Sequence, residues 1–205
     1  MIRNLVFDIG NVLISWKPGE YLLKAGYEAE SVQIIVDSVF RSSHWHSLDN
    51  GDITRAEAID LMASSSSITR DQIASLFDLC QEIIFPLTDN IKLLPELKKE
   101  GFRLYYLSNF PLEFFSDTKN RYDFFKYFDG GIISAEVRHS KPDPEIYKIL
   151  LDRYGLAAEE CLYIDDIEEN VRSAESSGMK AIHLSYAESL EKELSGNGIT
   201  LLLRG

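Results

Sequence analysis

Short apolar segments, each ended by glycine or polar residues, recur along the chain and predict β-strands. They lie at 5–7, 102–107, 131–134, 161–164, 181–184 and 199–203. Helical segments alternate with them after residue 88 and end at Gly101, Gly155 and Gly178, because glycine readily takes the left-handed conformation of a helix end. Pro95 is expected to kink the first of these helices or to mark its true start. This alternation predicts an α/β fold with a parallel sheet.

A long section between the first two strands has helical instead of strand periodicity. Its two apolar stripes recur every three or four residues and consist of Val32, Ile35, Val36, Val39 and Phe40, and of Ile73, Leu76, Phe77, Cys80, Ile83 and Ile84. Two helix starts carry capping boxes, Thr54 with Glu57 and Thr69 with Gln72, and the serine run at 64–67 separates two helices. We expect residues 15–88 to form a helical cap domain inserted into a core of 1–14 and 89–205. The alternative is that this section belongs to the main layer.

Polar side chains follow several of the predicted strands at the point where each strand ends. Asp8 follows the first strand, Ser108 and Asn109 the second, and Asp165 and Asp166 a later one, while Lys141 lies in a loop with two prolines. Open α/β sheets carry their chemistry at this edge, so these side chains are expected to converge. Taken singly, each has an ordinary explanation as a turn, helix-cap or solvated loop residue. Asn170, one helical turn after Asp166, is a candidate to orient that carboxylate.

The overall composition restricts the classes of partner. The chain has 205 residues, of which 45% are hydrophobic, and a net charge of −12, so it can bury an ordinary core but repels polyanions. Binding to nucleic acid or to an anionic membrane is therefore not expected. Cys80 and Cys161 lie in apolar stretches without metal-ligand spacing, which predicts buried free thiols. The absence of a leader or of a bilayer-spanning apolar stretch favours a cytoplasmic protein.

The four polar segments resemble, in order and spacing, the motifs of the haloacid dehalogenase-like (HAD) hydrolase superfamily. The first motif, Asp8-Ile9-Gly10-Asn11-Val12, is similar to that of subfamily IA members in the sugar-phosphatase and epoxide-hydrolase N-terminal-domain branch. The resemblance implies a Rossmann-like parallel core, a small helical cap and Mg²⁺-dependent hydrolysis of a small phosphorylated metabolite. A sugar phosphate, such as a hexose 1-phosphate, is the expected substrate.

The resemblance also implies roles for individual residues. Asp8 would be the nucleophile that forms an aspartyl-phosphate, and Lys141 would pair with it and stabilise the transferring phosphoryl group, with Ser108 and Asn109 binding phosphate oxygens. Mg²⁺ would be bound by Asp8, the Gly10 carbonyl and Asp166, while Asp165 holds a metal-bound water. Candidates for the substrate-facing wall are Trp16, His44, Trp45, His46 and Phe110. For Trp45 and Phe110, ordinary core packing is an equally good interpretation.

Gly10 departs from the commonest form of the first motif, in which a second aspartate protonates the leaving group. The acid must then come from elsewhere, with His44, His46 and His139 as candidates, or be dispensable. A phosphomutase is disfavoured, because it needs that aspartate. Two alternatives to a phosphatase remain: a hydrolytic 2-haloacid dehalogenase, against which the Asp165–Asp166 pair argues, and a catalytically weak binding or regulatory protein.

Overall fold

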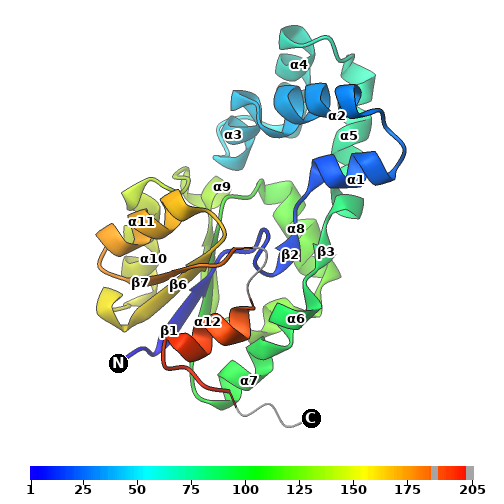
Figure 1. The fold of residues 1–205 in the computed structure, drawn as a ribbon. Helices are drawn as coiled ribbons and strands as arrows, with labels where there is room; N and C mark the ends of the chain where they lie inside the picture. Colours follow the sequence, from blue (N-terminus) through cyan, green and yellow to red (C-terminus); the bar gives the residue numbers. More distant parts are fainter. Residues whose placement is uncertain (186–188, 202–205) are drawn as a thin grey trace.

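The computed structural model describes residues 1–185 and 189–201. Its centre is a five-stranded parallel sheet with the order β5-β4-β1-β6-β7 (Figure 1). The strands are β1 (Asn4–Phe7), β4 (Arg103–Ser108), β5 (Gly130–Ile133), β6 (Cys161–Asp165) and β7 (Lys180–His183). The chain runs from β1 through β4 to β5 on one side and then returns to β6 and β7 on the other. The carboxyl ends of β1 and β6 therefore lie at the point where the strand order reverses.

Helices cover both faces of this sheet, as the sequence predicts for an α/β fold. Because successive side chains of a strand point to opposite faces, Leu5 and Phe7 join one apolar cluster and Val6 the other. The first cluster packs under α7 (Leu93–Lys99), α8 (Leu112–Arg121) and α12 (Leu190–Gly196), and the second under α10 (Pro144–Tyr154) and α11 (Glu168–Ser176). Shorter elements are α6 (Thr88–Ile91), α9 (Ser134–Val137) and the 3-10 turns η2 (Asp123–Tyr127) and η3 (Ala158–Glu160).

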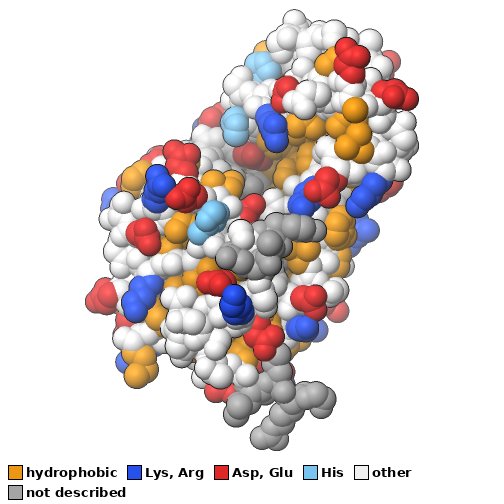
Figure 2. Space-filling view, in the orientation of Figure 1, with side chains coloured by type: hydrophobic (Ala, Val, Ile, Leu, Met, Phe, Trp, Pro, Cys, Tyr) orange, Lys and Arg blue, Asp and Glu red, His pale blue; other side chains and the backbone are white. Residues whose placement is uncertain are grey.

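A separate group of helices stands beyond the carboxyl ends of the strands (Figure 1). The chain enters it after β2 (Ile14–Ser15) and returns through β3 (Phe85–Pro86), and these two short strands pair antiparallel with Ile14 opposite Pro86. The group consists of α1 (Pro18–Lys24), α2 (Ala29–Ile35), the π-helical turn η1 (Val36–Phe40), α3 (Ser43–Asp49), α4 (Arg55–Ser65) and α5 (Arg70–Ile83). Hydrophobic side chains are visible in the recess between this group and the sheet (Figure 2).

Several local predictions are confirmed. The capping boxes that begin α4 and α5 are both formed, with Thr54 and Glu57 in one and Thr69 and Gln72 in the other. Pro95 lies in the first turn of α7, where its missing N–H costs nothing, so it marks a helix start. The three glycines expected to end helices all have positive φ angles. Cys80 and Cys161 are buried free thiols.

The strand expected at 199–203 is wrong as far as the structure describes it, and Leu202 and Leu203 lie outside the described residues. Ile199 follows Gly198, which has a φ of +81° after the end of α12. The Ile199 N–H donates to the carbonyl of Leu194 and its side chain is buried, as in the apolar contact that often accompanies a helix C-cap. The apolar run is therefore explained by packing against a helix. Within the described residues, no helix is long and apolar enough to cross a bilayer.

Candidate active site

Asp8 lies immediately after β1, at the centre of the sheet edge, and is 6% exposed. Its backbone N–H donates to the carbonyl of Ile164 (2.8 Å), which continues the pairing with β6. Its Oδ1 accepts hydrogen bonds from the backbone N–H of Ile9 (2.7 Å) and from Nζ of Lys141 (2.8 Å). These donors fix the orientation of the carboxylate. Burial raises the pKa of Asp8 to about 7, although the Lys141 charge opposes the shift.

Lys141 reaches Asp8 from the loop before α10, and the side chain of Asn109 holds this loop in place. The Asn109 amide donates to the carbonyl of Lys141 (2.9 Å) and accepts from its N–H (2.8 Å). The Lys141 Nζ lies between Asp8 Oδ1 (2.8 Å) and Asp165 Oδ2 (2.7 Å). Burial alone would lower the pKa of Lys141, but the charges of Asp165 and Asp8 outweigh it and raise the pKa. The lysine therefore stays charged.

Asp165 is fully buried at the end of β6, and protein donors surround its carboxylate. Oδ2 accepts from Lys141 (2.7 Å) and from the Tyr163 hydroxyl, and Oδ1 accepts from the Ile167 N–H (2.8 Å). The Asn170 amide donates to both oxygens at 3.1 Å. The expectation that Asn170 orients Asp166 is therefore wrong: Asn170 lies in the first turn of α11, and its side chain binds Asp165 instead.

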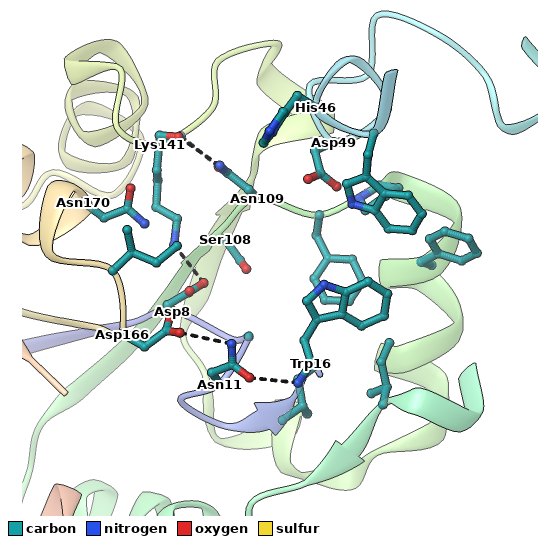
Figure 3. Close-up of a pocket in the computed structure, with 18 of the residues that line it drawn as sticks. Asp8, Asn11, Trp16, His46, Asp49, Ser108, Asn109, Lys141, Asp166 and Asn170 are labelled. Atoms are coloured by element: carbon teal, nitrogen blue, oxygen red, sulfur yellow. Dashed lines mark hydrogen bonds and ion pairs between the residues drawn. The ribbon is translucent and has the colours of Figure 1, made fainter. Parts of the chain in front are cut away.

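Asp166 differs from its neighbour because its half-buried side chain lines a cavity with Asp8. Its Oδ2 accepts from the Asn11 amide (3.0 Å), and the Asn11 Oδ1 accepts from the N–H of Trp16 (3.0 Å) (Figure 3). Asn11 has a φ of +52°, a conformation that asparagine tolerates better than most residues. Burial and the Asp165 charge raise the pKa of Asp166. Sequence reasoning gave Asn11 no role, although it stands in the first motif.

These three carboxylates suit a divalent cation. Oxygen atoms of Asp8, Asp165 and Asp166 lie within 4.8 Å of one another, and Lys141 supplies a single positive charge against three acids. Mg²⁺ takes one or two carboxylates and keeps water or phosphate oxygens elsewhere, so the donor set fits it. Asp166 and Asp8 face the cavity, whereas Asp165 already accepts from protein donors. Gly10 also lines the cavity, and a Cβ built there would meet no heavy atom within 4 Å.

The cavity has a volume of about 210 Å³ and lies between the sheet edge and the helical group. Its polar end is formed by Asp8, Ser108, Asn109, Lys141 and Asp166. Ser108 ends β4 and is 2% exposed, while the Asn109 amide is engaged with Lys141. The predicted phosphate-binding residues thus converge at one end, although binding itself stays a prediction.

The other end of the cavity is apolar and largely aromatic. Trp16 stacks on Trp45 at a centroid distance of 5.6 Å, and Trp45 stacks on Phe114 of α8 at 6.1 Å. Phe110 belongs to the same wall. Trp45 and Phe110 are also members of the main apolar cluster, at 5% and 8% exposure. Core packing and a place in the cavity wall therefore apply together.

The structure separates the three histidines that are candidates for the missing acid. His46 lines the cavity, His44 of the same helix does not, and His139 pairs with Asp143 at 2.8 Å outside it. A fourth group, Asp49, was missed by sequence reasoning although it lines the same wall. Burial raises the pKa of Asp49 to about 8. Its signal in the sequence, Asp49-Asn50-Gly51-Asp52, is typical of a turn and gives no hint of a half-buried carboxyl that lines a cavity.

Comparisons with known proteins agree with this geometry. A family model described as haloacid dehalogenase-like hydrolase matches residues 2–178. The sesquiterpene phosphatase of Aspergillus oryzae is 28% identical over 180 residues, which are 88% of this chain and 88% of that protein. The phosphoglycolate phosphatase of Escherichia coli is 27% identical over 93 residues, 45% of this chain and 37% of that protein. A HAD family enzyme of Bacteroides thetaiotaomicron, solved with magnesium and inorganic phosphate, has 25% identity and a TM-score of 0.73 over 94% of this chain and 99% of that one.

Proposed function

Because the chain belongs to the haloacid dehalogenase-like hydrolase family, we propose that it is a Mg²⁺-dependent phosphatase of small phosphorylated metabolites that works through an aspartyl-phosphate on Asp8. The observation that carries the proposal is the position of Asp8. It lies at the polar end of a cavity, with Lys141 at 2.8 Å and two further carboxylates beside it. Phosphatases among the relatives support the reaction class.

The residues divide the reaction among them. Asp8 attacks the phosphorus, and Lys141, held against Asp8 and Asp165, offsets negative charge on the transferring group. Ser108 and the backbone after it bind phosphate oxygens. Asn109 positions Lys141 through its amide.

A metal ion would be held by Asp8, the Gly10 carbonyl and Asp166, with Asp165 in a supporting position. When bound, Mg²⁺ neutralises the phosphate dianion and aligns it with the nucleophile. Asn11 orients Asp166 for this task through the 3.0 Å hydrogen bond. The magnesium in the similar Bacteroides enzyme supports the choice of metal.

The helical group, residues 15–88, acts as the cap, and residues 1–14 and 89–205 form the core that carries the chemistry. Trp16 and Trp45 from the cap, with Phe110 from the core, form the wall that contacts the leaving group. A sugar phosphate, such as a hexose 1-phosphate, was the sequence-based expectation and stays a prediction. The aromatic wall favours a second candidate, a phosphate monoester with an apolar leaving group, because sugar hydroxyls would find few partners there. The relative named sesquiterpene phosphatase supports this candidate.

The same features argue against the two alternative interpretations, a hydrolytic dehalogenase and a catalytically weak binding protein. A hydrolytic dehalogenase needs no metal and gains nothing from three clustered acids. A weakly catalytic binding protein has no need for a buried lysine aimed at a buried carboxylate.

The decisive experiment measures phosphate release by purified protein with Mg²⁺, using glucose 1-phosphate and an isoprenoid monophosphate, with and without chelator. Asp8→Asn should abolish release, because a neutral amide cannot form the ester. The matched control is Asp89→Asn, an exposed acid paired with Lys92. Release that survives the chelator, or more than a few per cent activity in Asp8→Asn, would contradict the proposal.

A further inference from the structure

The proposed phosphatase still needs a general acid, because Gly10 cannot protonate the leaving group. Asp49 ends α3 and lines the same cavity as Asp8, Ser108 and Lys141. Figure 3 shows its carboxyl on the cap side of the cavity, across from Asp8 and Ser108. When Asp8 attacks the phosphorus of a monoester in line, the leaving oxygen lies on the side of the phosphorus opposite Asp8. That side of the cavity is the one that carries Asp49. We propose that Asp49 is the acid that protonates the leaving oxygen and the base for the water that follows; this rests on the proposed function.

The backbone around Asp49 is fixed to the core. The Asp49 carbonyl accepts from the Ser134 hydroxyl, whose oxygen accepts from the N–H of Phe110 (3.0 Å). The next residue, Asn50, accepts from the Ser140 hydroxyl through its Oδ1 (2.9 Å). These contacts join the end of α3 to the loops that carry Phe110 and Lys141. The Asp49 carboxyl therefore occupies the cavity when the cap is docked on the core.

The surroundings of Asp49 favour its neutral form. Among the described residues, no lysine or arginine forms an ion pair with Asp49. The charged or titratable groups that line the same cavity are His46 on its own helix, Cys80 on α5, and Asp8, Lys141 and Asp166 across from it. Burial raises its pKa to about 8, so it carries a proton at neutral pH. His46 is a competitor because it lies one turn earlier on α3, but its side chain is exposed. A neutral carboxylic acid in an apolar wall is a suitable proton donor.

The two steps balance. In the first, an Asp8 oxygen forms a bond to phosphorus, the bond from phosphorus to the leaving oxygen breaks, and that oxygen takes the Asp49 proton with its electron pair. In the second, a water oxygen forms a bond to phosphorus and gives its proton to the Asp49 carboxylate. The bond from phosphorus to Asp8 breaks, and its electron pair returns to the Asp8 carboxylate. The sum is monoester plus water to alcohol plus phosphate, with Asp49 protonated again.

The test compares kcat/KM for two apolar monoesters, 4-nitrophenyl phosphate and 3-phenylpropyl phosphate, because kcat/KM reports the steps up to departure of the leaving group. Nitrophenolate leaves without a proton, whereas an alkoxide does not. Asp49→Asn should lower kcat/KM for the alkyl ester by about 10²–10⁴-fold and for the aryl ester by less than about tenfold. In the wild type, kcat/KM for the alkyl ester alone should fall above about pH 8, a readout that needs no variant.

Two variants control the comparison: Asp52→Asn, the same change at an exposed position of the same turn, and His46→Gln. Both should leave the ratio of the two esters unchanged. An equal loss on both esters in Asp49→Asn, no loss on either, or a selective loss in His46→Gln would overturn the assignment. A wild type that hydrolyses the aryl ester only with Mg²⁺ would preserve the proposed function in each of these cases. A wild type that hydrolyses neither ester nor any other monoester would instead remove the proposed function itself.

Discussion

Asp165 and Asp166 are adjacent in sequence but differently placed, so we expect them to differ in how strongly they affect metal binding, and this difference can be measured. Asp165→Asn removes the charge of a fully buried carboxylate that accepts from Lys141, Tyr163 and Asn170. Asp166→Asn removes the charge of a carboxylate that faces the cavity. The first change should weaken metal binding indirectly and the second directly.

The magnitudes follow from the contacts. Asp165→Asn loses the 2.7 Å charge-assisted contact with Lys141, worth about 1.5–3 kcal/mol. This loss of folding free energy is smaller than the ~3–5 kcal/mol expected when a buried charge loses its sole partner, because Lys141 still pairs with Asp8 at 2.8 Å. The Mg²⁺ concentration for half-maximal rate should rise about 10–100-fold, as for other changes behind the direct ligands. Asp166→Asn should leave no Mg²⁺-dependent turnover.

The assay measures initial rates of phosphate release against Mg²⁺ concentration, at a temperature where urea titration shows each variant to be folded. Glu168→Gln is the matched control, because it also removes one negative charge near the start of α11 but from an exposed pair with Arg172. It should behave as the wild type. Equal and mild effects of Asp165→Asn and Asp166→Asn would refute the reasoning and make the acidic pair a simple helix cap.

Other positions give further tests. Burial raises the pKa of Asp49 from 3.8 to about 8, so the folded state holds the Asp49 proton more tightly than the unfolded state does. The stability that this proton contributes is complete below about pH 4 and is lost as the pH rises through 8. In urea titrations, the free energy of unfolding of Asp49→Asn should therefore increase relative to that of the wild type across this pH range. Gly51→Ala should raise KM and lower the melting temperature, since φ is +74° and its Cβ would lie 2.6 Å from the carbonyl oxygen of Ala135; an unchanged KM would contradict the docking argument. Thr69→Ala should cost about 0.5–2 kcal/mol in urea titration through loss of its cap, with kcat unchanged. Gly10→Ala should fold with wild-type stability in the same titration, because its Cβ would meet no heavy atom within 4 Å.

Much of the core was predictable because it depends on local pattern. Short apolar strands ended by Asp8, Ser108 and Asp165 carry their chemical groups to one edge whatever the helices between them do. The same logic failed at Ile199, because an apolar run after a glycine fits a helix C-cap as well as a strand. The pattern of apolar residues identifies which side chains are buried but not which element they pack against.

The cap side of the site was less predictable, since it depends on how two distant segments meet. Asp49 and Ser134 are far apart in sequence, and their contact brings a carboxyl into the cavity. Asn170 shows the same limit at short range: a spacing of one helical turn was consistent with either Asp165 or Asp166, and the direction of its side chain decided for Asp165.

The short pairing of β2 with β3 determines how the two parts of the molecule are joined. Ile14 lies opposite Pro86, so the intervening chain leaves and returns at neighbouring points, as a loop does on a hairpin stem. The entropy of closing such a loop rises slowly, by about 0.6 kcal/mol for each doubling of its length. A stem of this kind can carry inserts of very different size without altering the strand register of the sheet. The three clustered acids Asp8, Asp165 and Asp166 are therefore encoded outside the stretch of sequence that carries Trp16, Trp45 and Asp49, and that stretch can be exchanged while the three acids are kept.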